Sequence, residues 1–148
     1  MTVRAIPEGY HTVTPYLVVE GVAKLIEFLT RAFDAKEVFR LAAPDGTVRH
    51  AEMQIGDSRV MMGEAQGQHT PIPAMLHLYV DDADAFVARA QKAGAKVTMP
   101  VEEQFWGDRY GKIEDPFGHH WSVGTHVRDV TPEEMKQAMQ KMAGPGHP

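Results

Sequence analysis

The side chains that could do chemistry in this sequence are histidines, carboxylates and tyrosines, which recur at alternating positions of extended segments. A neutral imidazole can act as a general base near neutral pH, so His50 and His77 are candidate catalytic residues. Lys112 is a third candidate, because its ammonium group could form an ion pair with Glu114 or bind an anion in a pocket. The chain has no cysteine, which excludes disulfides, thiolate nucleophiles and iron–sulfur clusters.

One combination of these residues could bind a metal ion. Glu64, His77 and His126 share one side of the expected strands, and two imidazoles with one carboxylate suit zinc, nickel, manganese or iron. In the competing interpretation, His77 and His126 form hydrogen bonds in a pocket wall and Glu64 lies at a strand end. We favour the second interpretation. Each two-residue step along a strand moves a side chain by about 6–7 Å. Unequal steps would therefore separate the three side chains too far to bind one metal ion, whose bonds are about 2.0–2.2 Å long.

Alternation along the strands sorts the side chains onto two faces. One face is almost uniformly apolar and should pack under helices: Leu17, Val19, Met53, Ile55, Leu76, Leu78, Val80, Trp121 and Val123. The other face mixes aromatic, polar and ionisable side chains and is expected to include Met62 and Glu64. This composition predicts a curved sheet that lines a ligand cavity, or else a face covered by a partner subunit. The candidate ligand-binding residues are Tyr16, Glu64, His77, Tyr79, Trp106, Tyr110, Ser122 and His126.

The elements that must position these residues form a repeat. The first copy is expected to contain a strand, a helix and three strands, at residues 13–19, 22–33, 36–41, 47–55 and 58–64. The second copy repeats this order, with strands at 76–80, 96–99, 110–114 and 120–125 and a helix that begins at Ala83. The two copies superpose at an offset of about 60 residues. Asp34 should adopt the left-handed conformation after the first helix.

The fold class is therefore α+β, with two tandem βαβββ modules forming curved mixed sheets around a cavity. The modules span residues 13–64 and 75–126 of a single domain at 7–139. A short helix is expected at 132–142, and 140–148 is expected to be a flexible tail. In the second module, His119 and His120 are expected to be exposed in a turn.

Composition and charge exclude several classes of protein. Hydrophobic residues make up 43% of the 148 residues and charged residues 24%, which is ordinary for a globular protein. The net charge of −5 and the absence of a Lys/Arg cluster argue against nucleic-acid binding. No apolar run approaches the roughly 20 residues that span a bilayer, so no membrane association and a cytoplasmic location are expected.

Four motifs carry a resemblance to a known family: 10-YHTVTPYL-17, 77-HLYVDDAD-84, 104-QFWGDRYG-111 and 115-DPFGHHW-121. Together they resemble the vicinal oxygen chelate superfamily of glyoxalase I, bleomycin-resistance proteins and extradiol dioxygenases, and within it the PhnB-like branch. The resemblance implies a glyoxalase-like fold, a small-molecule ligand and pairing of modules within or between chains. We therefore expect a homodimer, to which the helix at 132–142 contributes.

The resemblance also implies positions for metal ligands, and these are poorly occupied. Catalytic members bind a divalent metal through residues that here become Thr14, Met62, Met75 and Ser122, none of which offers a carboxylate or an imidazole. We therefore predict that no catalytic metal is tightly bound and that no cofactor is required.

Three functions remain open. The first is a metal-free small-molecule-binding protein, with bleomycin-resistance proteins as its pattern. The second is a divalent-metal enzyme, using Glu64, His77 and His126, that acts on a substrate with vicinal oxygens. The third is a metal-free enzyme with His50 or His77 as general base. Phe105 and Trp106, in the loop before the seventh strand, are expected to form a lid or a dimer contact.

Overall fold

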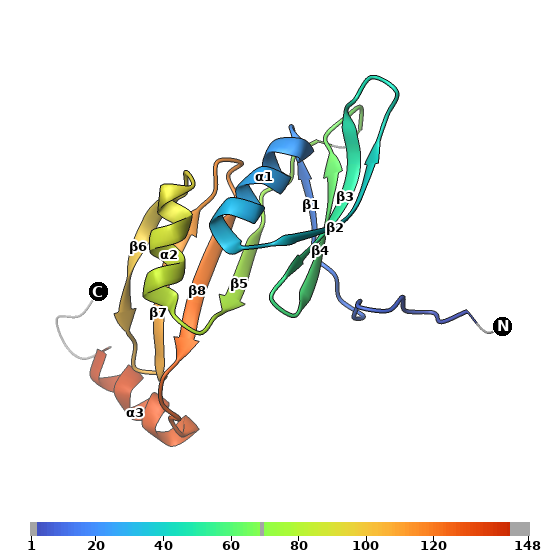
Figure 1. Cartoon of the computed structure of the whole chain (residues 1–148). Coiled ribbons are helices and arrows are strands. Elements are labelled where there is room, and N and C mark those ends of the chain that lie inside the picture. The colour runs from blue at the N-terminus through green and yellow to red at the C-terminus, as the bar shows by residue number, and fades with distance from the viewer. Residues whose placement is uncertain (1–2, 69, 143–148) are drawn as a thin grey trace.

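The chain folds into two βαβββ modules, each built on its own four-stranded mixed sheet (Figure 1). The computed structural model describes residues 3–68 and 70–142. Module 1 contains β1 (Tyr16–Val19), α1 (Val22–Phe33), β2 (Lys36–Ala42), β3 (Val48–Ile55) and β4 (Ser58–Glu64). Module 2 contains β5 (Met75–Tyr79), α2 (Ala83–Lys92), β6 (Lys96–Glu103), β7 (Asp108–Glu114) and β8 (His120–His126), and α3 (Pro132–Met142) follows.

The two sheets have equivalent strand orders, β1-β4-β3-β2 and β5-β8-β7-β6. The first strand of each module pairs in parallel with the last, and the remaining pairs are antiparallel. The parallel pairs arise because a helix returns the chain between β1 and β2 and between β5 and β6. The predicted α+β class and tandem order are confirmed.

The helices α1 and α2 pack against each other where the two modules meet (Figure 1). Their inner sides and the covered sheet faces form one core, in which Leu17, Leu25, Leu29, Met53 and Trp121 are almost fully buried. The Phe33 ring bridges the modules, because it lies 5.0 Å from the Phe86 ring and 4.9 Å from the Trp121 ring. The core is therefore continuous between the two modules.

Local signals in the sequence explain how both helices begin and end. Asp82 caps α2 by accepting a hydrogen bond from the Ala85 amide at 3.0 Å. Asp34 ends α1 with a φ of 54°, the left-handed conformation expected from the sequence. The predicted bounds of α1 and α3 agree with the structure.

Two strands differ from the sequence predictions by three or four residues because of proline, and the remaining strand bounds agree within two residues. β1 begins at Tyr16 and not at Val13, directly after Pro15, which has no amide hydrogen to donate. β6 continues past Met99 to Glu103, because β6 is an edge strand that accommodates Pro100 at a register shift.

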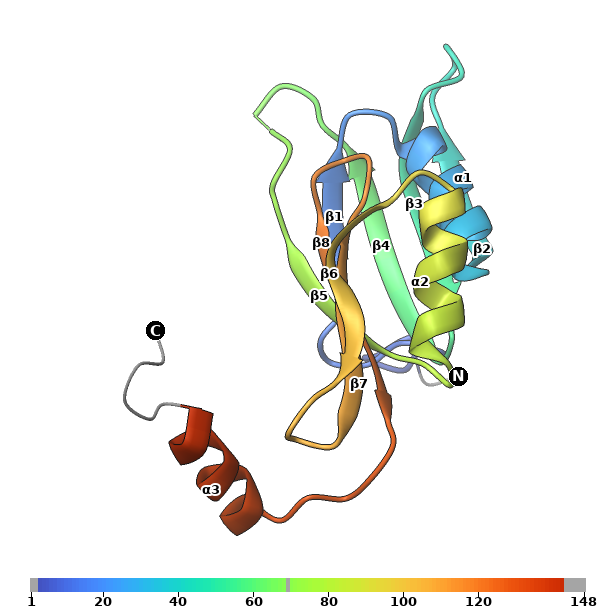
Figure 2. The same ribbon diagram turned by 90° about the vertical axis from the view of Figure 1, so that its left-hand side faces the viewer.

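Helix α3 stands apart from the sheets below module 2 (Figure 2). None of its residues is buried, and Met139 and Met142 are exposed. Residues 140–142, expected in the tail, complete this helix, and the rest of the predicted tail, 143–148, lies outside the described residues. No helix in the described part of the chain is long and apolar enough to cross a membrane.

Candidate functional site

Each sheet has one face under the helices and one open face. The helix side is apolar as predicted, although Leu76, Leu78 and Val80 are only partly buried. The open face of sheet 2 carries His77, Tyr79, Tyr110, Lys112, Ser122 and His126, as expected from strand alternation. The open face of sheet 1 carries Tyr16, Phe39, Leu41, His50 and Glu52.

Aromatic rings form a continuous cluster on the open face of sheet 2. The His77 ring lies 4.5 Å from the Tyr79 ring and stacks on Tyr110 at 5.9 Å. Tyr110 in turn meets Trp106 edge to face at 5.2 Å. The Nδ1 atom of His77 lies 2.7 Å from the buried Ser122 hydroxyl, which fixes the imidazole on β5.

A buried carboxylate, Asp108, ties this cluster together at the start of β7. It accepts hydrogen bonds from the Tyr79 hydroxyl at 3.0 Å, from the Trp106 indole at 3.1 Å and from His126 Nδ1 at 2.8 Å. Burial opposes ionisation, but these three donors prevail and hold the pKa of Asp108 below its usual value. Asp108 is only 2% exposed. Three predicted site residues, Tyr79, Trp106 and His126, bond to it, although the sequence did not mark Asp108 as a site residue.

The two histidines of this face have opposite electrostatic environments. Partial burial lowers the pKa of His77, against the opposing attraction of the Asp108 carboxylate. Hydrogen bonds to Asp129 at 2.7 Å and to Asp108 raise the pKa of His126. His77 is therefore suited to the neutral form and His126 to the imidazolium.

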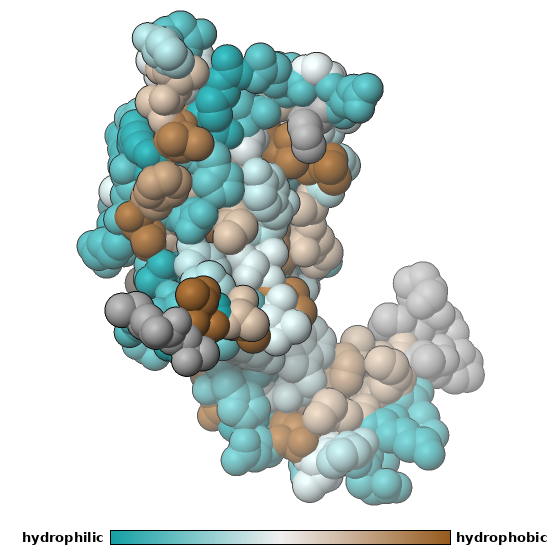
Figure 3. Space-filling model, turned by 90° about the vertical axis from the view of Figure 1, so that its right-hand side faces the viewer, coloured by the Kyte–Doolittle hydropathy of each residue, from teal (hydrophilic) through white to brown (hydrophobic). Residues whose placement is uncertain are grey.

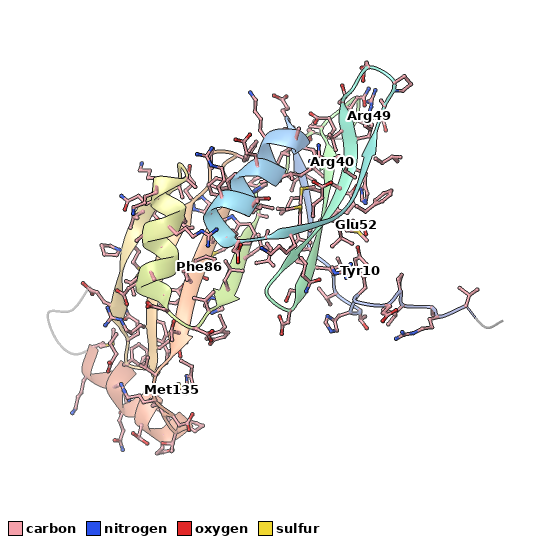
Figure 4. All side chains as sticks on the ribbon, viewed as in Figure 1. Tyr10, Arg40, Arg49, Glu52, Phe86 and Met135 are labelled. Atoms are coloured by element: carbon pink, nitrogen blue, oxygen red, sulfur yellow. The ribbon has the colours of Figure 1, made fainter. Side chains whose placement is uncertain are left out.

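The open face of sheet 1 holds a chain of polar groups. Glu52 accepts a hydrogen bond from the Tyr10 hydroxyl and contacts His50 Nε2 at 2.7 Å. On the other side of the ring, His50 Nδ1 lies 3.2 Å from the Tyr16 hydroxyl. Figure 4 shows Tyr10, from the N-terminal segment, beside Glu52. The sequence marked Tyr16 and His50 but missed Glu52 and Tyr10 as their partners.

A glycine at the same position of each sheet allows these contacts. Tyr16 reaches His50 across Gly63, where an added Cβ would lie 2.7 Å from the Tyr16 hydroxyl. His77 reaches Tyr110 across Gly124, where a Cβ would lie 3.2 Å from the imidazole. Glycine inside a strand is the sequence signal that could have located both contacts.

Glu64 does not lie on the open face, contrary to the prediction. Its carboxylate accepts hydrogen bonds from the amides of Gly21 at 2.8 Å and Val22 at 3.0 Å, so it caps the start of α1. Met62 is likewise fully buried on the helix side. The short turn after Ile55 sets this register, because it pairs Ala51 with Met62 and thereby inverts the expected parity of β4.

The alternative metal ligands are not brought together. Glu64 caps α1 in module 1, whereas His77 and His126 are engaged by Ser122 and Asp108 in module 2. Within residues 3–68 and 70–142, no group of three His, Cys, Asp or Glu side chains is arranged to hold a metal ion. Among the family ligand positions, Met75 is 60% exposed and the Thr14 hydroxyl donates to the His11 carbonyl.

A cleft of about 960 Å³ overlaps the aromatic cluster only at His77 and Tyr79. It runs along the free edge of β5 and faces the segment before β1 and the β3–β4 turn. Of the predicted ligand-binding residues, His77 and Tyr79 line it and the other six do not. A smaller cleft of about 380 Å³ adjoins Tyr79 and His126. The predicted ligand-binding residues thus lie mainly on open sheet faces within a single chain.

The expectation that His119 is exposed is wrong. Its side chain is 1% exposed and lies 3.2 Å from the Asp115 carboxylate, which also accepts a hydrogen bond from the Trp121 indole at 2.9 Å. His120 is exposed on β8, as expected. The Asp-Pro-Phe-Gly turn therefore has a structural role, because Asp115 secures the β7–β8 connection from inside.

This fold, with paired βαβββ modules and polar open faces, is that of the glyoxalase-like proteins. The chain belongs to the glyoxalase/bleomycin resistance protein/dioxygenase superfamily, whose sequence model matches residues 10–123.

Two relatives resemble this chain over more than half of its length. The chain is 44% identical to the uncharacterized protein Mb0911c of Mycobacterium bovis over 137 residues, which cover 85% of this chain and 90% of that protein. It is 27% identical to protein YjdN of Escherichia coli over 92 residues, which cover 60% of this chain and 63% of YjdN.

Solved structures show the same architecture. TioX from Micromonospora sp. ML1 superposes with a TM-score of 0.66 at 26% identity, covering 79% of this chain and 99% of TioX. A PhnB protein from Bacillus cereus superposes with a TM-score of 0.60 at 17% identity, covering 78% of this chain and 99% of that chain, and it supports the fold alone.

Proposed function

We propose that the chain is a metal-free small-molecule-binding protein whose ligand stacks on the open face of sheet 2. The observation that carries this proposal is the ring cluster of His77, Tyr79, Tyr110 and Trp106, in which the buried Asp108 fixes Tyr79 and Trp106 by hydrogen bonds. Tyr79 is 66% exposed although its hydroxyl is anchored, so a flat surface is held ready for contact. Preorganised aromatic side chains bind planar groups with little loss of entropy.

The charges of this face favour a planar ligand with an acidic group. Lys112 lies on the same face as the rings, in the strand next to Ser122. His126 adds a second positive charge, because its raised pKa favours the imidazolium, although Asp108 and Asp129 offset much of that charge. An anionic substituent would therefore point toward Lys112 while the rings stack.

A binding test can use the natural probe of this face, Trp106. 2-Naphthoate, a planar aromatic carboxylate, should quench Trp106 fluorescence, whereas Trp121 is buried and hydrogen-bonded to Asp115. Tyr110→Ala should weaken binding by about tenfold or more, as for an aromatic hot spot. Arg49→Ala, far away on sheet 1, is the matched control (Figure 4). Equal affinities of Tyr110→Ala and the wild type would contradict the site.

The proposed assembly is a homodimer in which the open faces line a shared cavity that small molecules can enter. Large apolar side chains are exposed on both, namely Tyr16, Phe39 and Leu41 on sheet 1 and Met75 and Tyr79 on sheet 2. Figure 3 shows one side of the molecule, on which apolar residues lie among polar ones. Because one chain does not enclose its ring cluster, a second copy would supply the missing wall. The exposed Met139 and Met142 of α3 give a further apolar contact for it.

Charge reversal can test which faces meet. Glu52 on sheet 1 and Lys112 on sheet 2 have opposite charges at equivalent positions of the two modules. If sheet 1 of one copy faces sheet 2 of the other, Glu52→Lys and Lys112→Glu should each raise the dimer dissociation constant, and the double variant should restore it. Light scattering at micromolar concentration measures this. A monomeric wild type would refute the dimer.

The metal-free part of the proposal has its own test. It is supported by the engagement of Glu64, His77 and His126 in other hydrogen bonds. Calorimetric titration with zinc, nickel, manganese or iron(II) should show no stoichiometric submicromolar binding. Binding that disappears in His77→Ala would instead favour the divalent-metal enzyme acting on vicinal oxygens.

A further inference from the structure

The polar chain on sheet 1 has the geometry of an activated nucleophile. A nucleophile, its base and a group that orients the base must lie within hydrogen-bonding distance in series. The Tyr16 hydroxyl lies 3.2 Å from His50 Nδ1, and His50 Nε2 lies 2.7 Å from Glu52. The other oxygen of Glu52 is held by the Tyr10 hydroxyl, so the orienting group is itself fixed.

The direction of each hydrogen bond follows from the chemistry of the groups. An ionised carboxylate only accepts, so the proton of a neutral His50 lies on Nε2 and points to Glu52. Nδ1 then has a free lone pair, to which the Tyr16 hydroxyl donates. Proton transfer from Tyr16 to His50 would create an imidazolium beside the Glu52 carboxylate, which stabilises it.

Tyr79 offers an internal comparison, since it is exposed to a similar extent but has a different acceptor. Tyr16 is 52% exposed and Tyr79 is 66% exposed. The Tyr79 hydroxyl donates to Asp108, whose negative charge raises the pKa of Tyr79. The pKa of Asp108 is itself lowered, so Asp108 is a poor base for the Tyr79 proton. Tyr79 should therefore react slowly and Tyr16 quickly.

We propose that Tyr16, His50 and Glu52 form a nucleophilic triad that accepts acyl groups from small activated esters. The Tyr16 oxygen attacks the ester carbonyl carbon, and its proton passes to His50 Nδ1. The bond from the carbonyl carbon to the leaving oxygen then breaks, and His50 returns the proton to the leaving alcohol. The product is an ester on Tyr16, formed without an oxidant, a reductant or a metal ion. The site goes beyond reversible binding on sheet 2 and requires neither that ligand nor a dimer.

The test uses p-nitrophenyl acetate with the full-length protein at pH 7. Release of nitrophenolate gives the rate, and peptide mass spectrometry locates the acetyl group. We expect acetylation of Tyr16 at least about tenfold faster than that of Tyr79, as expected for a base-assisted nucleophile. Glu52→Gln and His50→Asn should lower the Tyr16 rate by at least about tenfold and leave the Tyr79 rate unchanged.

A glycine pair supplies variants that leave every ionisable group in place. Gly63→Ala should displace the Tyr16 hydroxyl from His50 and lower the Tyr16 rate in the same way. Gly124→Ala, at the equivalent position of sheet 2, should leave the Tyr16 rate unchanged. For Gly63→Ala, an unchanged Tyr79 rate and an unchanged circular dichroism spectrum show that the variant is folded. For Gly124→Ala, whose added Cβ would lie 3.5 Å from the Tyr79 ring, the circular dichroism spectrum alone serves this purpose. Loss of the Tyr16 rate in Gly124→Ala as well would overturn the local mechanism.

The proposal is overturned if acetyl groups appear on lysines but not on Tyr16, or if His50→Asn reacts at Tyr16 as fast as the wild type. Nitrogen-15 NMR gives a second readout that requires no reagent. Long-range correlations should place the proton of the neutral His50 ring on Nε2, and a proton on Nδ1 would also overturn the proposal. Failure of 2-naphthoate to bind would refute the function proposed for sheet 2 and leave this result standing.

Discussion

The two modules share one topology but are stabilised in different ways. In module 1, α1 buries seven residues, among them Leu25, Phe28 and Leu29. In module 2, α2 buries only Ala83, Val87 and Ala90. Module 2 instead contains the four buried polar or charged residues of the described chain, Asp108, Asp115, His119 and Ser122. Apolar burial therefore anchors the helix of module 1, while hydrogen-bonded polar groups fix the strands of module 2.

This difference determines which open face can be rigid. The rings of sheet 2 rest on Asp108, whereas Tyr16 on sheet 1 is held by partly exposed groups. A buried polar group requires all its hydrogen bonds, and once satisfied it specifies one arrangement of its neighbours. Sheet 2 is thus suited to a preformed binding platform, and sheet 1 to a side chain that exchanges a proton.

The largest loss of stability is expected from a substitution in the β7–β8 turn of module 2, which Asp115 secures. Asp115→Ala would leave the Trp121 indole and the amides of Phe117 and His119 without their buried acceptor. We expect the free energy of unfolding to fall by about 3 kcal/mol, since each such group costs about 1–3 kcal/mol. Urea denaturation measures the loss.

The matched control is Asp57→Ala, in the β3–β4 turn of module 1. The Asp57 side chain is exposed, and within the described residues it accepts a hydrogen bond only from its neighbour Ser58. Its replacement should change stability by no more than about 0.5 kcal/mol. Equal losses of stability in the two variants would show that polar groups are no more important for the stability of module 2 than for that of module 1.

A smaller effect is expected from the residues that cap the two helices. Glu64→Ala removes two acceptors from the start of α1 and should cost about 1–2 kcal/mol. Thr125→Val removes the hydroxyl that accepts a hydrogen bond from the Ala83 amide at 2.7 Å, at the start of α2, and should cost about 1 kcal/mol. Thermal unfolding can rank the two. Glu20→Ala, an exposed neighbour of Gly21, should have no measurable effect, and a loss equal to that of Glu64→Ala would argue against the cap.

The same comparison shows what the sequence could predict. Repeats of strand, helix and turn signals were enough for the fold, because hydrophobic alternation and local caps are properties of short segments. Register across a turn was not predictable for β4. The tight connection after Ile55 pairs Ala51 with Met62, so Glu64 lies under the helix and not on the open face.

The residues of the site could be predicted from the sequence, but the hydrogen bonds that connect them could not. Strand parity alone placed Tyr16, His50, His77, Tyr79 and Tyr110 on open faces. The hydrogen-bonding partners of these residues were not predicted, because Asp108 lies at the first position of β7 and Glu52 is one carboxylate among many. Hydrogen bonds between residues distant in sequence, such as Tyr79 to Asp108, depend on packing that alternation does not encode.

The smallest effect should be the opposite titration of the two histidines on sheet 2. In NMR titrations, His77 should titrate below its unperturbed value of about 6.5 and His126 above it. The contribution of His126 to stability is then complete below about pH 6.5 and is lost as the pH rises through its folded pKa. For His77 the contribution is complete above about pH 6.5 and is lost as the pH falls.

These two histidines together should give stability a maximum near pH 6.5, on top of the slopes from the carboxylates. His126→Gln should flatten the alkaline side of the profile, because it removes the imidazolium that bridges Asp108 and Asp129. His77→Gln should flatten the acidic side, because the variant has no imidazole beside Ser122 whose protonation at low pH would destabilise the fold. If both histidines titrate on the same side of pH 6.5, the burial of His77 and the hydrogen bonds of His126 to Asp129 and Asp108 do not separate their environments, and the rigid platform inferred for module 2 loses its electrostatic basis.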